Sequence, residues 1–173
     1  MKKQIRTGVF ETNSSSCHSV SITRDKEITQ IDTLEYTDDD KAIVHFGEFG
    51  WGVDTFNDSN TKLNYLMTMA AETSKVPDSI EEFFDSEDFH LIEDAVKSHN
   101  PDCEGIYLAD EISIETFSYR DQEYKHLKFD GYIDHQSCED YSSAKDFLDS
   151  YDITAEDFIF NPKVILHIDN DNH

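Results

Sequence analysis

Positively charged residues are scarce in this chain. It has 14 lysine and arginine residues against 38 aspartate and glutamate residues, which gives a formal net charge of −24 at pH 7. A protein that binds duplex nucleic acid needs many lysine and arginine side chains to displace counterions from the phosphates. The shortage of these residues therefore argues against direct binding to nucleic acid.

Cysteines and long apolar runs are also few. Cys17, Cys103 and Cys138 form no Cys-x-x-Cys pair, and such an odd set is typical of reduced thiols in a cytoplasmic protein. No apolar run approaches the roughly 20 residues that a membrane helix needs. Lys2 and Lys3 are not followed by the apolar core of an export signal. We therefore expect a cytoplasmic protein that makes no contact with a membrane.

The excess of negative charge lies in the body of the chain. Residues 1–26 carry a net charge of +3, whereas the rest of the chain carries 9 basic and 36 acidic side chains. Repulsion among these acidic side chains destabilises the folded state, so we expect the negative charge to have a function. One use is contact with a basic partner, with carboxylates standing in for phosphates. The alternative is solubility alone.

The most distinctive stretch is 6–22, with a small polar loop followed by Val20 and Ile22, which alternate with serines. This period of two predicts a strand after the loop. The polar residues of the loop that can carry chemistry are Asn13, Ser15, Ser16, Cys17 and His18. His18 is a base for a serine or cysteine nucleophile if the turn folds back. The alternative is a turn whose side chains cap backbone groups.

A second polar motif consists of Asp134, His135, Gln136, Ser137 and Cys138. It follows the segment 124–134, whose alternation predicts a strand with one covered face. Asp134 is placed to orient a histidine and raise its basicity. If His18 and His135 share a pocket, the two motifs form the site of a small hydrolase or transferase. Neither motif has zinc-ligand spacing, so we expect no metal and no cofactor.

These motifs carry a resemblance to known proteins. The block Arg-x-Gly-x-Phe-Glu-Thr-Asn-Ser-Ser-Ser-x-His-Ser, at 6–19, resembles the opening of a family of small phage and bacterial proteins. The segments 47–51, 62–66 and 131–137 resemble that family too. The resemblance covers most of the chain and implies a phage origin, a bacterial host and candidate positions for a site. It implies no mechanism, because no activity is settled for the family.

Apolar periodicity predicts the secondary structure. Helices are expected over 61–73, 79–84, 87–99, 142–151 and 154–160, and strands over 42–46, 105–109, 111–119, 124–134 and 164–168. The last strand is continuously apolar and should be buried. A slip in apolar phase between Ile114 and Phe117 predicts a bulge. This order predicts an α+β fold, a mainly antiparallel sheet with helices packed on one face, in a single domain over 1–173 whose polar tail begins at about Asp169.

Acidic residues gather in three clusters. Their members are Asp38, Asp39 and Asp40; Glu81, Glu82, Asp85, Glu87 and Asp88; and Glu139 and Asp140. We expect these clusters to contact the groove of a basic host protein that handles nucleic acid, such as a defence enzyme, and to inhibit it as nucleic-acid mimics. Such binding is fast and is weakened by salt. The enzyme built from the two histidine motifs is the alternative function.

Overall fold

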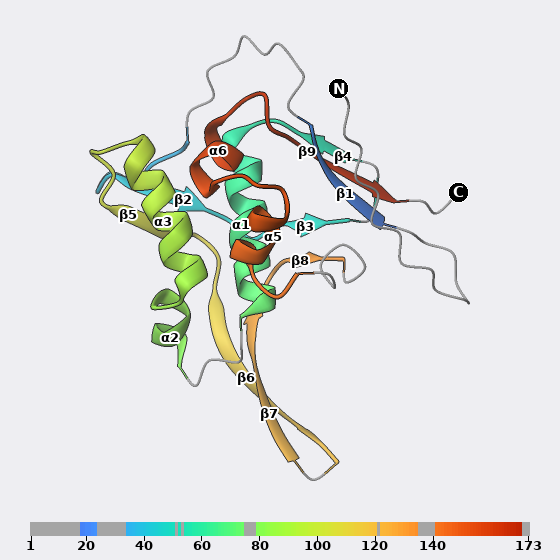
Figure 1. Cartoon of the computed structure of the whole chain (residues 1–173). Helices are drawn as coiled ribbons and strands as arrows, with labels where there is room; N and C mark the ends of the chain where they lie inside the picture. Colours follow the sequence, from blue (N-terminus) through green and yellow to red (C-terminus); the bar gives the residue numbers. More distant parts are fainter. Residues whose placement is uncertain are drawn as a thin grey trace.

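The computed structural model describes residues 18–23, 34–50, 52, 54–74, 79–120, 122–134 and 141–170. Figure 1 shows helices and strands mixed along the chain, which confirms the expected combination of the two. Both parallel and antiparallel strand pairs occur, in small sheets. The finer expectation of a mainly antiparallel sheet with helices on one face therefore stays a prediction.

Helices form where the sequence predicted them. They are α1 (Ser59–Thr73), α2 (Ile80–Phe84), α3 (Glu87–His99), α5 (Ala144–Ser150) and α6 (Ala155–Phe160). Helix α1 begins two residues earlier than expected, because the Asp58 side chain accepts the Thr61 N–H at 2.7 Å and caps the first turn. The Ser86 hydroxyl caps α3 in the same way, at 3.2 Å from the Phe89 nitrogen.

The start of α2 has the sequence of a capping box, with Ser79 followed three residues later by Glu82. The Ser79 side chain makes no capping hydrogen bond to the first turn. Instead, the pKa of Glu81 is held below its ordinary value, first by a hydrogen bond from its own backbone N–H and then by one from Ser79. On α3, apolar spacing predicts a buried stripe of Leu91, Ile92, Ala95 and Val96. The structure differs by one residue, since Phe89 is buried and Leu91 is only half-buried.

Strand β9 (Ile165–Asn170) is the middle strand of a three-stranded antiparallel sheet. It lies between β1 (His18–Thr23) and β4 (Asp54–Phe56). Val164, Leu166 and Ile168 are buried, which confirms the prediction of a buried inner strand. Strand β9 continues to Asn170 opposite β1, so Asp169 and Asn170, the first residues of the expected polar tail, pair in the sheet.

Two further strand pairs are parallel. Strand β2 (Lys41–Val44) pairs with β5 (Gly105–Leu108), and β3 (Glu48–Phe49) pairs with β8 (Tyr132–Ile133). The prediction of one continuous strand over 124–134 is wrong, because β7 ends at Phe129 and β8 is a separate strand that begins at Tyr132. A Cβ atom at Gly131 would lie 2.7 Å from the Cβ of Phe46 and 3.0 Å from the Gly47 carbonyl oxygen, so the chain turns there at a point of close contact.

The strands β6 (Ile112–Tyr119) and β7 (Gln122–Phe129) form a hairpin that projects from the body of the protein (Figure 1). Their register is unbroken from end to end, so the predicted bulge is wrong. The apolar phase slips because Phe117 lies on the outer face, opposite to Ile114. There its ring stacks on Tyr124 of β7, with the ring centroids 5.5 Å apart.

An ion pair between Lys128 and Glu115 on this outer face affects the pKa of the Glu115 carboxyl. Lys128 Nζ lies 2.9 Å from Glu115 Oε1, and this hydrogen bond, with the lysine charge, lowers the pKa of Glu115. A lowered folded-state pKa means that the pair stabilises the fold above the unfolded pKa and loses this effect as the pH falls through the folded pKa. We expect Lys128→Gln to return the pKa of Glu115 towards its ordinary value, as followed by NMR titration of the carboxyl carbon. The His126→Gln control should move it less, because the nearby imidazole is the smallest of the lowering causes; equal shifts would contradict this assignment.

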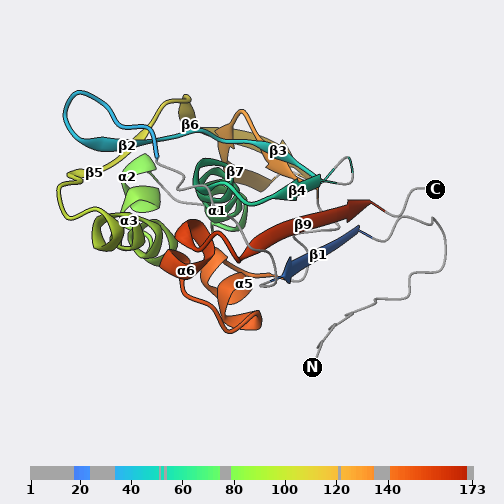
Figure 2. The same cartoon turned by 90° about the horizontal axis from the view of Figure 1, so that it is seen from above.

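Helix α1 is the centre of the core. Leu63, Leu66, Met67 and Met69 are fully buried on it. Figure 2 shows α1 between β2 and β3 on one side and α5 and α6 on the other, and it contacts α3 as well. The helix therefore holds the parallel strand pairs and the C-terminal helices in one packed unit.

Candidate functional site

The acidic cluster at 81–88 borders a hollow in the surface. The hollow has a volume of about 440 Å³. Its walls come from the end of α1, from α2, from the start of α3 and from the residues just before α5: Ala70, Thr73, Ser74, Glu82, Phe83, Ser86, Glu87, Asp88, Ser142 and Ser143. Eight of these ten residues carry a carboxylate or a hydroxyl group, although apolar atoms make up most of the exposed lining. The carboxylates of Glu82 and Glu87 make the rim negative, so the hollow suits a positively charged group that also has an apolar part.

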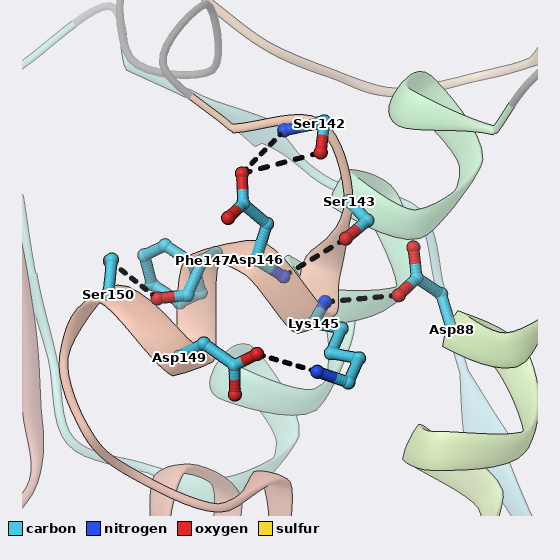
Figure 3. A network of polar contacts seen from close by, with 8 residues as sticks. All are labelled: Asp88, Ser142, Ser143, Lys145, Asp146, Phe147, Asp149 and Ser150. Carbon is cyan, nitrogen blue, oxygen red and sulfur yellow. Dashed lines mark hydrogen bonds and ion pairs between the residues drawn. The ribbon is translucent and has the colours of Figure 1, made fainter.

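Asp88 has a structural role at this site. Its Oδ2 accepts the Ala144 N–H at 3.0 Å. Its Oδ1 accepts the Lys145 N–H at 3.0 Å, as Figure 3 shows. These are N–H groups of the first turn of α5, which have no partner within the helix and which a carboxylate stabilises. Asp88 was predicted to contact a partner, but both of its oxygens are used to hold α5 against α3.

The remaining polar contacts at the start of α5 are local to that helix (Figure 3). The Ser143 hydroxyl accepts the Asp146 N–H at 3.0 Å, and Asp146 accepts the Ser142 N–H at 3.0 Å. Lys145 Nζ lies 2.6 Å from Asp149 Oδ2, and this hydrogen bond, with the charge of Asp149, raises the pKa of Lys145. The lysine is therefore directed along its own helix, not towards the hollow.

Replacing Asp88 by alanine is expected to lower the free energy of unfolding by about 2 kcal/mol, because two charged hydrogen bonds to helix N–H groups are lost. Chemical denaturation measures the change, and faster amide exchange at Ala144 and Lys145 would locate it. Asp94→Ala is the matched control, since this exposed acid of α3 makes no side-chain hydrogen bond within the described part of the chain. Equal effects of the two substitutions would contradict the capping role of Asp88.

The cluster Asp38–Asp40 lies in the turn before β2. All three side chains are exposed, and Asp40 has φ +56°, a conformation that aspartate tolerates better than most residues. The Asp40 carbonyl accepts the Glu104 N–H at 2.9 Å, which brings exposed acids of the β5 side, Asp102 and Glu104, to the same end of the strand pair. The predicted cluster is therefore larger than its sequence neighbours suggest.

Several predicted site residues lie outside the described part of the chain. They are Asn13, Ser15, Ser16, Cys17, His135, Gln136, Ser137, Glu139 and Asp140. His18 begins β1, where its backbone lies opposite Asn170. Asp134 follows β8 and donates its N–H to the Phe49 carbonyl at 2.8 Å. The shared site of His18 and His135 therefore stays a prediction.

The sequence analysis missed one polar pair. His45 follows β2 and Asp110 follows β5, and because these strands are parallel their carboxyl ends meet at one edge. His45 Nδ1 lies 3.2 Å from Asp110 Oδ1, and the other Asp110 oxygen accepts the Phe46 N–H at 2.7 Å. The carboxylate thus orients the imidazole, as in sites that transfer protons. This contact could have been predicted only if the parallel pairing of the segments 42–46 and 105–109 had been known.

Neither a metal centre nor a membrane helix is found in the described ranges. No group of three or more His, Cys, Asp or Glu side chains there converges on a point where it could hold a metal ion. None of the helices in those ranges has the length and apolar character needed to cross a bilayer. Comparisons of the chain with protein-family models, with curated proteins and with solved structures give no match. Function must therefore be inferred from the charges and geometry of the chain.

Proposed function

We propose that this chain is a phage-encoded inhibitor that binds a basic protein of the bacterial host, one that handles nucleic acid. Carboxylates occupy the positions that phosphates would take in the groove of that protein. The net charge of −24 is the observation that carries the proposal. A field of this size accelerates encounter with a positive groove and gives binding that weakens as salt is added.

The corner between α2 and α3 is the proposed centre of the contact surface. Glu81, Glu82, Asp85 and Glu87 are all exposed there, and Glu82 and Glu87 border the hollow. An arginine of the partner has the donors to bond these carboxylates and the neighbouring hydroxyls together, with its charge neutralised at the same time. The exposed acids at 38–40 form a second contact in this proposal.

Rigidity of the corner supports the same function. Asp88 joins α3 to α5 through two hydrogen bonds, and Phe83 of α2 packs on Phe89 of α3, with ring centroids 5.7 Å apart. The carboxylates are therefore held on fixed elements before a partner arrives. Such preorganisation reduces the entropy lost on binding.

Capture from a lysate of the bacterial host, followed by competition, tests the proposal. The chain is immobilised, the bound proteins are washed with increasing NaCl, and duplex DNA is added as a competitor. We expect a bound protein with a basic nucleic-acid groove, released both by salt and by duplex DNA, and inhibited in its own nucleic-acid assay by the free chain. Bound proteins that resist salt and DNA, and whose nucleic-acid activity the chain leaves unchanged, would contradict the proposal.

A further inference from the structure

Strand β6 is an edge strand whose outer side is unpaired. Its residues pair with β7 along the whole length. Within the described ranges no other strand pairs with β6, and none of its backbone groups forms a hydrogen bond beyond the hairpin. In an antiparallel pair, alternate residues direct N–H and C=O away from the partner strand. Among the described residues, the outward N–H and C=O groups of this eight-residue strand therefore have no hydrogen-bond partner.

The features that normally protect such an edge are missing from β6. Natural edge strands avoid further pairing by means of lysine, proline, bulges or short length. Strand β6 has an unbroken register, contains neither lysine nor proline, and has Glu115 as its single charged residue. Its partner strand β7 carries Lys125 and Lys128, which are protective residues of this kind. The two edges of the hairpin thus differ, and β6 is the edge that suits an added strand.

We propose that β6 binds an extended, positively charged segment of the partner protein by β-strand addition. The segment lies beside β6 as a third strand, main-chain hydrogen bonds supply affinity, and alternate side chains supply specificity. The added strand also stabilises the hairpin, because a two-stranded hairpin is only marginally stable in water. This inference rests on the proposed function and adds the form in which the basic partner is bound.

The negative charge around β6 favours a positively charged segment as the added strand. Helix α2, which carries the exposed residues Glu81 and Glu82, contacts β6. Glu111 is exposed just before β6, and Glu115 is exposed within it. Lysine or arginine at alternate positions of the added segment would lie beside Glu111 and Glu115, which are four residues apart and so belong to one face of the strand. A second copy of this chain is disfavoured as the occupant, because two bodies with a charge of −24 repel each other.

Aromatic rings on the outer face fit the same occupant. Phe117 and Tyr124 have exposed fractions of 48% and 41%, although their rings are large and apolar. They form a stacked pair on the face that an added strand would extend. An arginine or an aliphatic side chain of the added strand can cover these rings, because guanidinium groups and aliphatic chains pack well on aromatic faces.

The test uses the full-length chain and three synthetic peptides of about ten residues. The first peptide alternates lysine and valine. The second has the same sequence with several consecutive central residues N-methylated, which keeps the charge and removes the N–H donors from both edges. The third alternates serine and valine and is neutral. Binding is followed at low and high salt by fluorescence anisotropy and by backbone hydrogen exchange.

We expect the lysine–valine peptide to slow exchange of the outward amides of β6 by at least about tenfold, with no change on the outer edge of β7. The N-methylated and the neutral peptides should bind at least about tenfold more weakly. Thr116→Lys, which adds a protective lysine to β6, should reduce binding of the first peptide. Gln122→Lys, which adds the same charge to β7, is the matched control and should reduce it much less.

The outcomes separate this inference from the proposed function. Equal, salt-sensitive binding of the methylated and unmethylated peptides would overturn strand addition and leave the charge-based function standing. Equal protection of β6 by the neutral and the lysine peptides, with no effect of salt, would overturn the basic occupant and count against the charge-based function. Protection of β6 that rises with protein concentration when no peptide is present would show a second copy as the occupant, and would also overturn the inference.

Discussion

Replacing Lys62 by alanine is expected to lower the free energy of unfolding by about 3 kcal/mol. Lys62 lies on α1 and is fully buried. Its Nζ donates hydrogen bonds to the carbonyls of Asn161, at 3.1 Å, and of Val164, at 3.2 Å. The side chain thus ties α1 to the connection between α6 and β9, and its removal leaves buried carbonyls without this donor and a cavity in the core.

A second substitution separates these two contributions. Lys62→Met keeps most of the volume but donates no hydrogen bond, so it is expected to cost about 2 kcal/mol, less than the alanine variant. Lys163→Ala is the control, because it removes an exposed lysine from the same connection and should change stability by less than about 0.5 kcal/mol. Urea denaturation measures all three variants; a Lys62→Ala variant as stable as Lys163→Ala would contradict the buried bridge.

Gly50→Ala is expected to cost about 3 kcal/mol, for two independent reasons. Gly50 has φ +106°, a conformation that residues with a side chain rarely adopt. An added Cβ would also lie 2.7 Å from the Asp134 Cβ and 3.2 Å from the Asp134 nitrogen. Because the second of these atoms belongs to the backbone, β8 would have to move away from β3.

A nearby glycine provides the control for this substitution. At Gly52, among the residues that the structure describes, a Cβ would meet the Asp54 carboxylate alone, at an ordinary contact distance of 3.6 Å, so Gly52→Ala should cost less than about 1 kcal/mol. Thermal unfolding measures both variants. Amide exchange at Asp134 should accelerate in the Gly50 variant alone, since its bond to the Phe49 carbonyl is the contact that moves. Equal stability of the two variants would contradict the close approach of β3 and β8.

Helices were predictable here because their signals are local. The bounds of α3 agree with the expected range, since an N-cap serine, acids in the first turn and basic residues in the last turn all lie within that segment. The stripe of α1 followed from apolar spacing alone. Capping bonds were less predictable: Ser79 has the sequence of a capping box but does not form one.

Strand pairing could not be predicted, because it depends on residues far apart in the sequence. Short strands were expected at the positions of β2 and β5, but a local apolar pattern contains no information on their parallel register. The contact between His45 and Asp110 depends on that register and was missed for this reason. The break before β8 depends on the approach of Gly131 to Phe46, which no local pattern reports.

The candidate site was predictable in its charge but not in its shape. The acids of 81–88 are evident in the sequence, whereas the other walls of the hollow come from the end of α1 and from the residues before α5. The role of Asp88 also required the docking of α5 against α3. A run of acids in a sequence therefore mixes groups that face a partner with groups that hold the fold together.

Binding of the captured host protein by two matched charge variants, as a function of salt, tests the central claim most directly. The corner variant combines Glu81→Gln, Glu82→Gln, Asp85→Asn and Glu87→Gln. The dispersed variant removes the same charge from exposed positions on other elements, by Glu35→Gln, Asp54→Asn, Asp94→Asn and Glu156→Gln. We predict that the corner variant binds at least about tenfold more weakly at low salt and with a shallower salt dependence, while the dispersed variant stays within about threefold of the unchanged chain. Equal weakening by both variants, or a dissociation constant of the unchanged chain that does not vary with salt, would contradict a carboxylate surface directed at a basic partner.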